Sequence, residues 1–106
     1  MTRHHALMCT FLVALLGTTA LAQSGPGARY DWTRDNTLGW TLMTTQERAE
    51  HQAKMRAVKT YEECQTLQNE HHQAMEARAK EKGITLRPPR RNGCDVMKER
   101  GILKLR

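Results

Sequence analysis

The stretch TYEECQTLQNEHHQAMEARAKEKG, residues 60–83, decides the fold. It opens with a capping box, in which the Thr60 hydroxyl accepts from the third backbone N–H of a helix and the Glu63 carboxylate accepts from the backbone N–H of Thr60. It closes at Gly83, where a left-handed residue commonly ends a helix. Between these ends, side chains at three-four spacing form one stripe: Tyr61, Cys64, Leu67, Gln68, His71, Met75 and Arg78. The stretch therefore predicts one long helix over residues 61–82.

The same capping signal occurs upstream, at Thr44 to Glu47, and predicts an earlier helix over residues 45–58. Only Lys59 and Thr60 separate the two helices, and so short a break usually makes consecutive helices neighbours. The first helix has two rows of residues that could pack against the second helix, one of alanines and one of larger side chains. That second row consists of His51, Met55 and Val58.

The segment after Gly83 is long enough to run back along the second helix. The helix covers roughly 28 Å from Cys64 to Gly83, and the eleven residues that follow reach at most about 36–40 Å. Pro88 and Pro89 keep this segment extended, with Ile84, Leu86 and Pro88 in place to lie against the helix. A turn at Asn92-Gly93 then precedes a short final helix over residues 95–100, stopped at Gly101. The expected fold class is all-α, a helical hairpin with an extended C-terminal strap tied back by one disulfide.

The first 22 residues have the pattern of a cleavable secretory signal peptide. Arg3 supplies the positive charge, residues 6–17 are apolar, and Ala20-Leu21-Ala22 fits the cleavage site. An uncleaved membrane anchor is the alternative, but an anchor needs roughly 20 apolar residues. Cleavage leaves 84 of the 106 residues and a net charge of +5, from sixteen basic and eleven acidic residues. We expect one small periplasmic or secreted domain, with no transmembrane segment after cleavage.

Cysteine usage agrees with export. Cys9 lies within the apolar leader, so the mature chain keeps only Cys64 and Cys94. Outside the cytoplasm such a pair normally forms a disulfide, which we expect to stabilise the fold by roughly 3.5 kcal/mol. A redox-active or metal-binding thiol pair would usually show Cys-x-x-Cys spacing.

Residues 23–43 lack a helical or strand period and are expected to form an extended arm ahead of a disulfide-tied helical domain, residues 44–106. Tyr30, Trp32 and Trp40 stand out in this arm. Such aromatic side chains either fold back onto the helix pair or anchor a partner.

Histidine and methionine at helical spacing give one candidate metal site. His51 and Met55 are four residues apart, as are His71 and Met75, with His72 alongside. Equal counting from the turn at residues 59–60 places His71 roughly 4.5 Å along the axis from His51, within side-chain reach. Imidazole and thioether groups suit copper, and imidazole also suits zinc. The alternative is that the methionines fill the core and the histidines border it.

The remaining signals argue for binding without catalysis. Arg87, Arg90 and Arg91 belong to a polybasic C-terminal region, which serves solubility or meets an anionic envelope component or acidic protein. No signature of a nucleic-acid-binding module accompanies it. The only serine of the mature chain is Ser24, and no activated nucleophile stands beside a histidine. We therefore expect no enzyme activity.

The stretch Leu42-Met43-Thr44-Thr45-Gln46-Glu47-Arg48, with its charged helix, resembles the small periplasmic proteins of the LTxxQ family, the CpxP and Spy group. Leu42 and Gln46 keep the motif's separation, whereas threonine is third and not second, and one copy is present. The resemblance implies an exported helical protein that binds unfolded proteins or responds to envelope stress. The leading hypothesis is thus a stress-associated binding protein that engages proteins or envelope components; the alternative is a copper or zinc carrier.

Overall fold

The computed structural model describes residues 25–105, and this part of the chain is mostly helical. No strand occurs within it, and one isolated bridge joins Thr60 to Lys104. The all-α class is confirmed. The predicted signal peptide lies outside the described residues. The elements in chain order are η1 (Pro26–Arg29), η2 (Trp40–Leu42), α1 (Thr45–Ala57), α2 (Tyr61–Lys82) and α3 (Gly93–Glu99).

Both long helices begin at the predicted caps. At α1 the Thr44 hydroxyl accepts from the backbone N–H of Glu47, and the Glu47 carboxylate accepts from that of Thr44, at 3.1 and 3.0 Å. At α2 the Thr60 hydroxyl accepts from Glu63, but the Glu63 carboxylate accepts from Lys59 instead of Thr60. Gly83 ends α2 with a φ of 66°, the left-handed conformation expected there.

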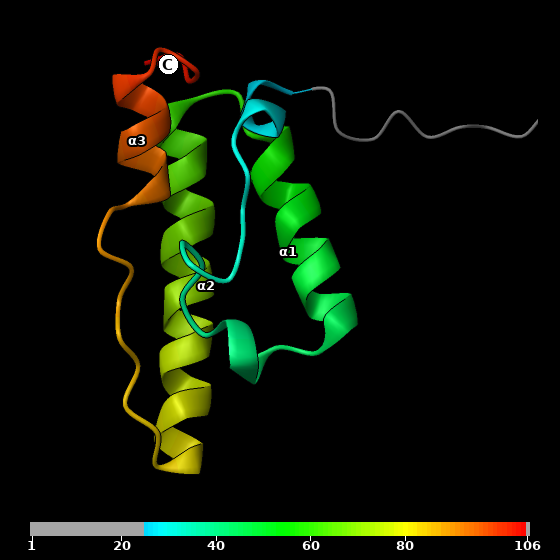
Figure 1. Ribbon diagram of the computed structural model, residues 1–106, viewed down its shortest axis with the longest axis vertical. Coiled ribbons are helices and arrows are strands. Elements are labelled where there is room, and N and C mark those ends of the chain that lie inside the picture. The colour runs from blue at the N-terminus through cyan, green and yellow to red at the C-terminus, as the bar shows by residue number, and fades with distance from the viewer. Residues whose placement is uncertain (1–24, 106) are drawn as a thin grey trace, which may run out of the picture.

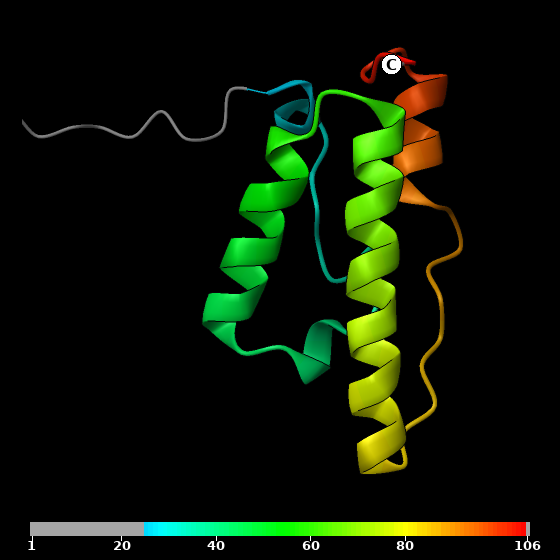
Figure 2. The ribbon, with the colours of Figure 1, turned by 180° about the vertical axis from the view of Figure 1, so that it is seen from behind.

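The arm folds back against one face of the helix pair. The two helices run in opposite directions, and the arm crosses in front of them in Figure 1 and behind them in Figure 2. The carbonyl oxygen of Trp32 accepts from Gln52 of α1 at 2.6 Å, and that of Leu38 accepts from Nε2 of His71 on α2 at 2.8 Å. The arm is therefore hydrogen-bonded to both helices.

Two apolar clusters result. The first brings the arm, all three helices and the C-terminal residues together around the disulfide: Trp32, Met55, Val58, Cys64, Cys94, Met97 and Leu103. The second lies further along α2 and contains Leu38, Met43 and Met75. Met55 of α1 and the following Val58 are buried, so the histidine-methionine row faces inward. Of the alanine row, Ala49 and Ala57 are exposed and Ala53 is half-buried.

The third helix starts two residues earlier than predicted. The Asn92 side chain accepts from the backbone N–H groups of Cys94 and Asp95, so Asn92 is a helix cap where a turn was expected. The preceding segment runs back beside α2 (Figure 1). Leu86 packs on the second cluster, while Ile84 is 47 % exposed.

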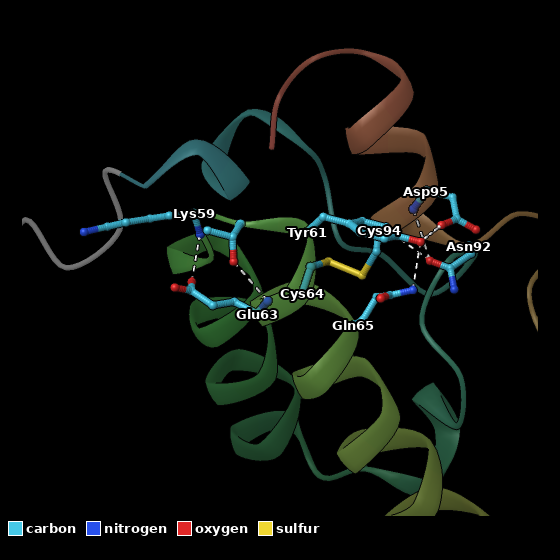
Figure 3. The surroundings of a disulfide bond; sticks show 9 residues. Lys59, Tyr61, Glu63, Cys64, Gln65, Asn92, Cys94 and Asp95 are labelled. Carbon is cyan, nitrogen blue, oxygen red and sulfur yellow. Dashed lines mark hydrogen bonds between the residues drawn. A yellow bond between two sulfur atoms is a disulfide. The ribbon is translucent and has the colours of Figure 1, made fainter. Parts of the chain in front are cut away.

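The predicted disulfide joins Cys64 of α2 to Cys94 of α3, with their Cα atoms 5.7 Å apart. Polar contacts flank it (Figure 3): the Tyr61 hydroxyl donates to the Asp95 carboxylate at 2.5 Å and accepts from Gln65 at 2.8 Å. A Cβ atom at Gly93 would lie only 2.6 Å from the Trp32 ring. The disulfide, α3 and the arm therefore form one tightly packed unit.

Candidate functional site: the groove between the two long helices

His51 of α1 and His71 of α2 meet face to face across the interhelical space. Their ring centroids are 3.8 Å apart, with an angle of 25° between the ring planes. Each histidine lies one turn before a buried methionine on its helix, Met55 on α1 and Met75 on α2. The pair thus lies at the junction of the two apolar clusters, in the register that equal counting from the turn predicted.

Burial keeps this histidine pair neutral. It lowers the pKa of His51 from 6.5 to about 4, and the neighbouring His71, His72 and Lys54 add to that effect. Burial also lowers the pKa of His71, although its hydrogen bond to the Leu38 carbonyl opposes the change. The stack is therefore uncharged at neutral pH, which is the state in which imidazole binds a metal.

The histidines line a groove of about 260 Å³ between α1 and α2. An ion pair between Glu47 of α1 and Arg78 of α2 lies at its end near the start of α1. Arg78 also donates to the Leu42 carbonyl at 3.1 Å, which fixes η2 against α2. The hydrogen bond from Arg78 is the main reason that the pKa of Glu47 falls to about 2. The other lining residues are Met43, Glu50, Lys54, Leu67, Glu70, Ala74 and Met75.

A second hollow of about 590 Å³ adjoins this groove near the turn between the helices. The two have Lys54 and Leu67 in common, so they adjoin. The surface of the second hollow is mostly apolar, with Ala57, Val58 and Leu67 among its lining residues, and Glu62 and Glu63 also line it. We call the two hollows together the interhelical groove.

The structure separates the five predicted metal ligands into different environments. His51, His71 and Met75 line the interhelical groove together. Met55 is fully buried in the first cluster, and His72 lines another hollow beside Leu86. Within residues 25–105 no group of three or more histidine, cysteine or acidic side chains is arranged to hold a metal ion.

Met43 is a groove residue that sequence reasoning missed. It lines the groove beside Met75 and belongs to the second cluster. It precedes the cap of α1, so it follows no helical period, and no local signal marks it as buried.

Comparison with known proteins adds no relative. No protein-family model, curated protein or solved structure matches the chain. The resemblance to the LTxxQ proteins stays a prediction. Its residues lie at the start of α1, where Gln46 donates to Glu50 at 3.1 Å and the Leu42 carbonyl accepts from Arg78. Among the described residues, no helix is long and apolar enough to cross a bilayer.

Proposed function

We propose that the protein is exported and binds segments of other polypeptides, without catalysis, in the interhelical groove. One observation carries the proposal: the arm is hydrogen-bonded to both α1 and α2, yet two hollows lined by residues of these helices stay open. Hollows whose lining combines apolar surface with charged groups can hold apolar side chains of an unfolded or helical segment.

The charges at the groove favour one kind of segment. Glu47 and Arg78 neutralise one another, which leaves the exposed Glu50 and Glu70 against Lys54 along the groove. The histidine pair adds no charge at neutral pH. The preferred occupant is therefore a segment whose apolar side chains are flanked by lysine or arginine.

The cysteines and the predicted leader support the proposed compartment. A disulfide is typical of proteins outside the reducing cytoplasm. Together with the predicted signal peptide, it supports action in the periplasm or outside the cell. The resemblance to the LTxxQ proteins supports the same proposal, with unfolded envelope proteins as partners.

Two exposed alanines on α2 give a matched test. Ala74 lines the groove, whereas Ala77, three residues later, lines no hollow that we describe. Ala74→Arg should block the groove, and Ala77→Arg adds the same side chain elsewhere on the helix. Purified mature protein and the Ala77→Arg variant should slow the aggregation of a reduced, unfolded client, while Ala74→Arg should not. Equal activity of both variants, or no activity of the unaltered protein, contradicts the proposal.

A second candidate function is that of a small copper or zinc carrier. The observation that favours it is the convergence of two neutral imidazoles and two thioethers, those of Met43 and Met75, on one groove. Thioether sulfur suits Cu(I), and imidazole suits either copper ion or zinc.

Titration of the mature protein with Cu(I), Cu(II) and Zn(II) tests this candidate. His51→Ala/His71→Ala should abolish tight uptake, while His72→Ala, which alters a different hollow, should retain it. Absence of tight uptake that depends on His51 and His71 contradicts the carrier function and leaves polypeptide binding untouched.

A further inference from the structure

A basin of about 600 Å³ lies between the arm, the extended segment before α3 and α3 itself. Its walls carry five arginines from three parts of the chain, and Asp35 is the one acidic residue among them. These arginines are Arg34, Arg87, Arg90, Arg91 and Arg100. We call this depression the arginine basin. It shares no residue with the interhelical groove.

Local features restrict the backbone in each wall of the basin. On the arm side, Asn36 accepts from the backbone N–H of Thr33 at 2.8 Å and donates to the Asp31 carbonyl at 2.7 Å, which holds the turn that bears Arg34. On the opposite side, Pro88 and Pro89 restrict the backbone between the arginines.

The packing around the disulfide joins the two sides. Gly93 lies against the rings of Trp32 and Tyr30, and Cys94 is bonded to Cys64. The arginines therefore converge on a site whose backbone is already in place, so that little ordering is needed when an anion binds.

Most of these guanidinium groups lack a counter-charge. Arg91 pairs with Glu99 at 2.6 Å, and Arg100 lies 5.9 Å from the centre of the Tyr30 ring. Within residues 25–105, Arg34, Arg87 and Arg90 form no ion pair and no side-chain hydrogen bond. Asp35 lines the basin and Glu99 pairs with Arg91, so five arginines against these two carboxylates leave an excess of three positive charges at the basin.

We propose that the arginine basin is a binding site for a ligand that carries two or more phosphate groups close together. The planar guanidinium forms paired hydrogen bonds with phosphate oxygens, and several such groups around one basin match several phosphates. A single carboxylate carries one charge and would leave most of the guanidinium groups without a partner. The phosphates belong either to a soluble compound or to the headgroups of an anionic lipid surface.

Inorganic pyrophosphate is the probe for the soluble source. Calorimetric titration of the mature, oxidised protein at physiological ionic strength should give saturable binding. Arg87→Gln/Arg90→Gln should weaken it by about tenfold or more, because each lost guanidinium removes charge-assisted hydrogen bonds. The control Arg29→Gln/Lys82→Gln also removes two positive charges, but from exposed positions outside the basin. It should weaken binding by less than about threefold.

Vesicles distinguish the lipid source. Sedimentation with vesicles of phosphatidylcholine alone, and of phosphatidylcholine with phosphatidic acid, tests whether clustered headgroups occupy the same basin. The site belongs to a lipid surface if the protein binds only the vesicles that contain phosphatidic acid. This binding should be lost in Arg87→Gln/Arg90→Gln and reversed by pyrophosphate. Binding of pyrophosphate without vesicle binding assigns it to a soluble ligand. Equal weakening by both double variants, or binding of neither probe, overturns the proposal.

Discussion

The rings of His51 and His71 stack with 3.8 Å between their centroids, and Nε2 of His71 is bonded to the Leu38 carbonyl of the arm. Three segments of the chain, α1, α2 and the arm, therefore meet at one uncharged contact. Glu47, Glu50, Lys54, Glu70 and Arg78 surround it in the groove. Protonation of either ring would place a positive charge in a half-buried stack. We therefore expect the stability of this contact between α1, α2 and the arm to depend on pH.

The first prediction concerns stability in mild acid. The folded-state pKa of His51, about 4, is below its ordinary 6.5, so in this range the unfolded chain binds more protons than the folded one. Stability is then complete above about pH 6.5 and falls as the pH drops toward 4. The loss should be about 1–2 kcal/mol, allowing for the partial exposure of the ring. Urea unfolding at a series of pH values measures it.

His51→Leu isolates this effect, because it keeps an apolar group of similar size and removes the proton site. Its stability should fall less between pH 6.5 and 4.5 than that of the unaltered protein, while the lowered pKa values of His71 and His72 keep part of the response. A pH profile identical in the two proteins would show that the stack does not carry the response.

The second prediction concerns the ion pair that joins α1 to α2. The pKa of the Glu47 carboxyl, about 2, is below its ordinary 4.5, so its contribution is present above pH 4.5 and is lost as the pH falls through 2. Glu47→Gln keeps the capping box and removes the charge. This variant should have a lower midpoint of thermal unfolding at pH 7. Its stability should also fall less steeply below pH 4.5 than that of the unaltered protein. Glu50→Gln, one turn later on α1, is the control and should do neither.

Local signals in the sequence predicted the helices well. Thr44, Thr60 and Gly83 mark helix ends through hydrogen bonds to backbone groups a few residues away, so their positions can be inferred without the fold. The approach of His51 to His71 was also accessible, because a two-residue break leaves few registers for an antiparallel pair. The disulfide could be predicted from the number of cysteines that follow the predicted leader.

The course of the arm could not be predicted from local sequence signals. It is held largely through its own carbonyl oxygens, which every residue carries, and the donors Gln52 and His71 have no sequence feature that points to the arm. Trp32 follows no period, so its burial depends on contacts with residues distant in the chain. Asn92 followed by Gly93 is typical both of a turn and of a helix cap, which explains the early start of α3.

The arginine basin illustrates the same limit. The sequence indicated a polybasic C-terminal region, but Arg34 of the arm joins it only because Trp32 packs against Gly93. Charge along a chain does not reveal which cations share a surface. That relationship depends on the tertiary fold.

The third prediction tests the contact between the arm and α3. Gly93→Ala places a methyl group against the Trp32 ring, where a Cβ would lie at 2.6 Å, and should destabilise the protein by about 1–3 kcal/mol. Trp32→Phe removes the ring atoms that crowd this position. In that background Gly93→Ala should cost at least about 1 kcal/mol less, as a double-mutant cycle in urea measures. The same cost in both backgrounds would contradict the contact.

The fourth prediction concerns the energetic role of the disulfide. Cys64→Ala/Cys94→Ala opens a loop of 30 residues and should lower the free energy of unfolding by roughly 3.5 kcal/mol at most. Because Cys64 and Cys94 lie in the first cluster, the arm should loosen with α3. In a Trp40→Phe background, where Trp32 is the remaining tryptophan, emission should therefore shift to longer wavelength before the protein loses its helical signal. Loss of both signals at one denaturant concentration, with unchanged stability, would contradict this role.

The covalent state of the two cysteines tests the account most directly, since the proposal of export, the first cluster and the arginine basin all rest on the disulfide. Protein recovered from the periplasm or medium, with thiols blocked at lysis, is digested without reduction and its peptides are identified by mass spectrometry. We predict that the leader is absent and that one linked pair of peptides contains Cys64 and Cys94. Two blocked, unlinked cysteines in a protein with the native helical spectrum would contradict the account.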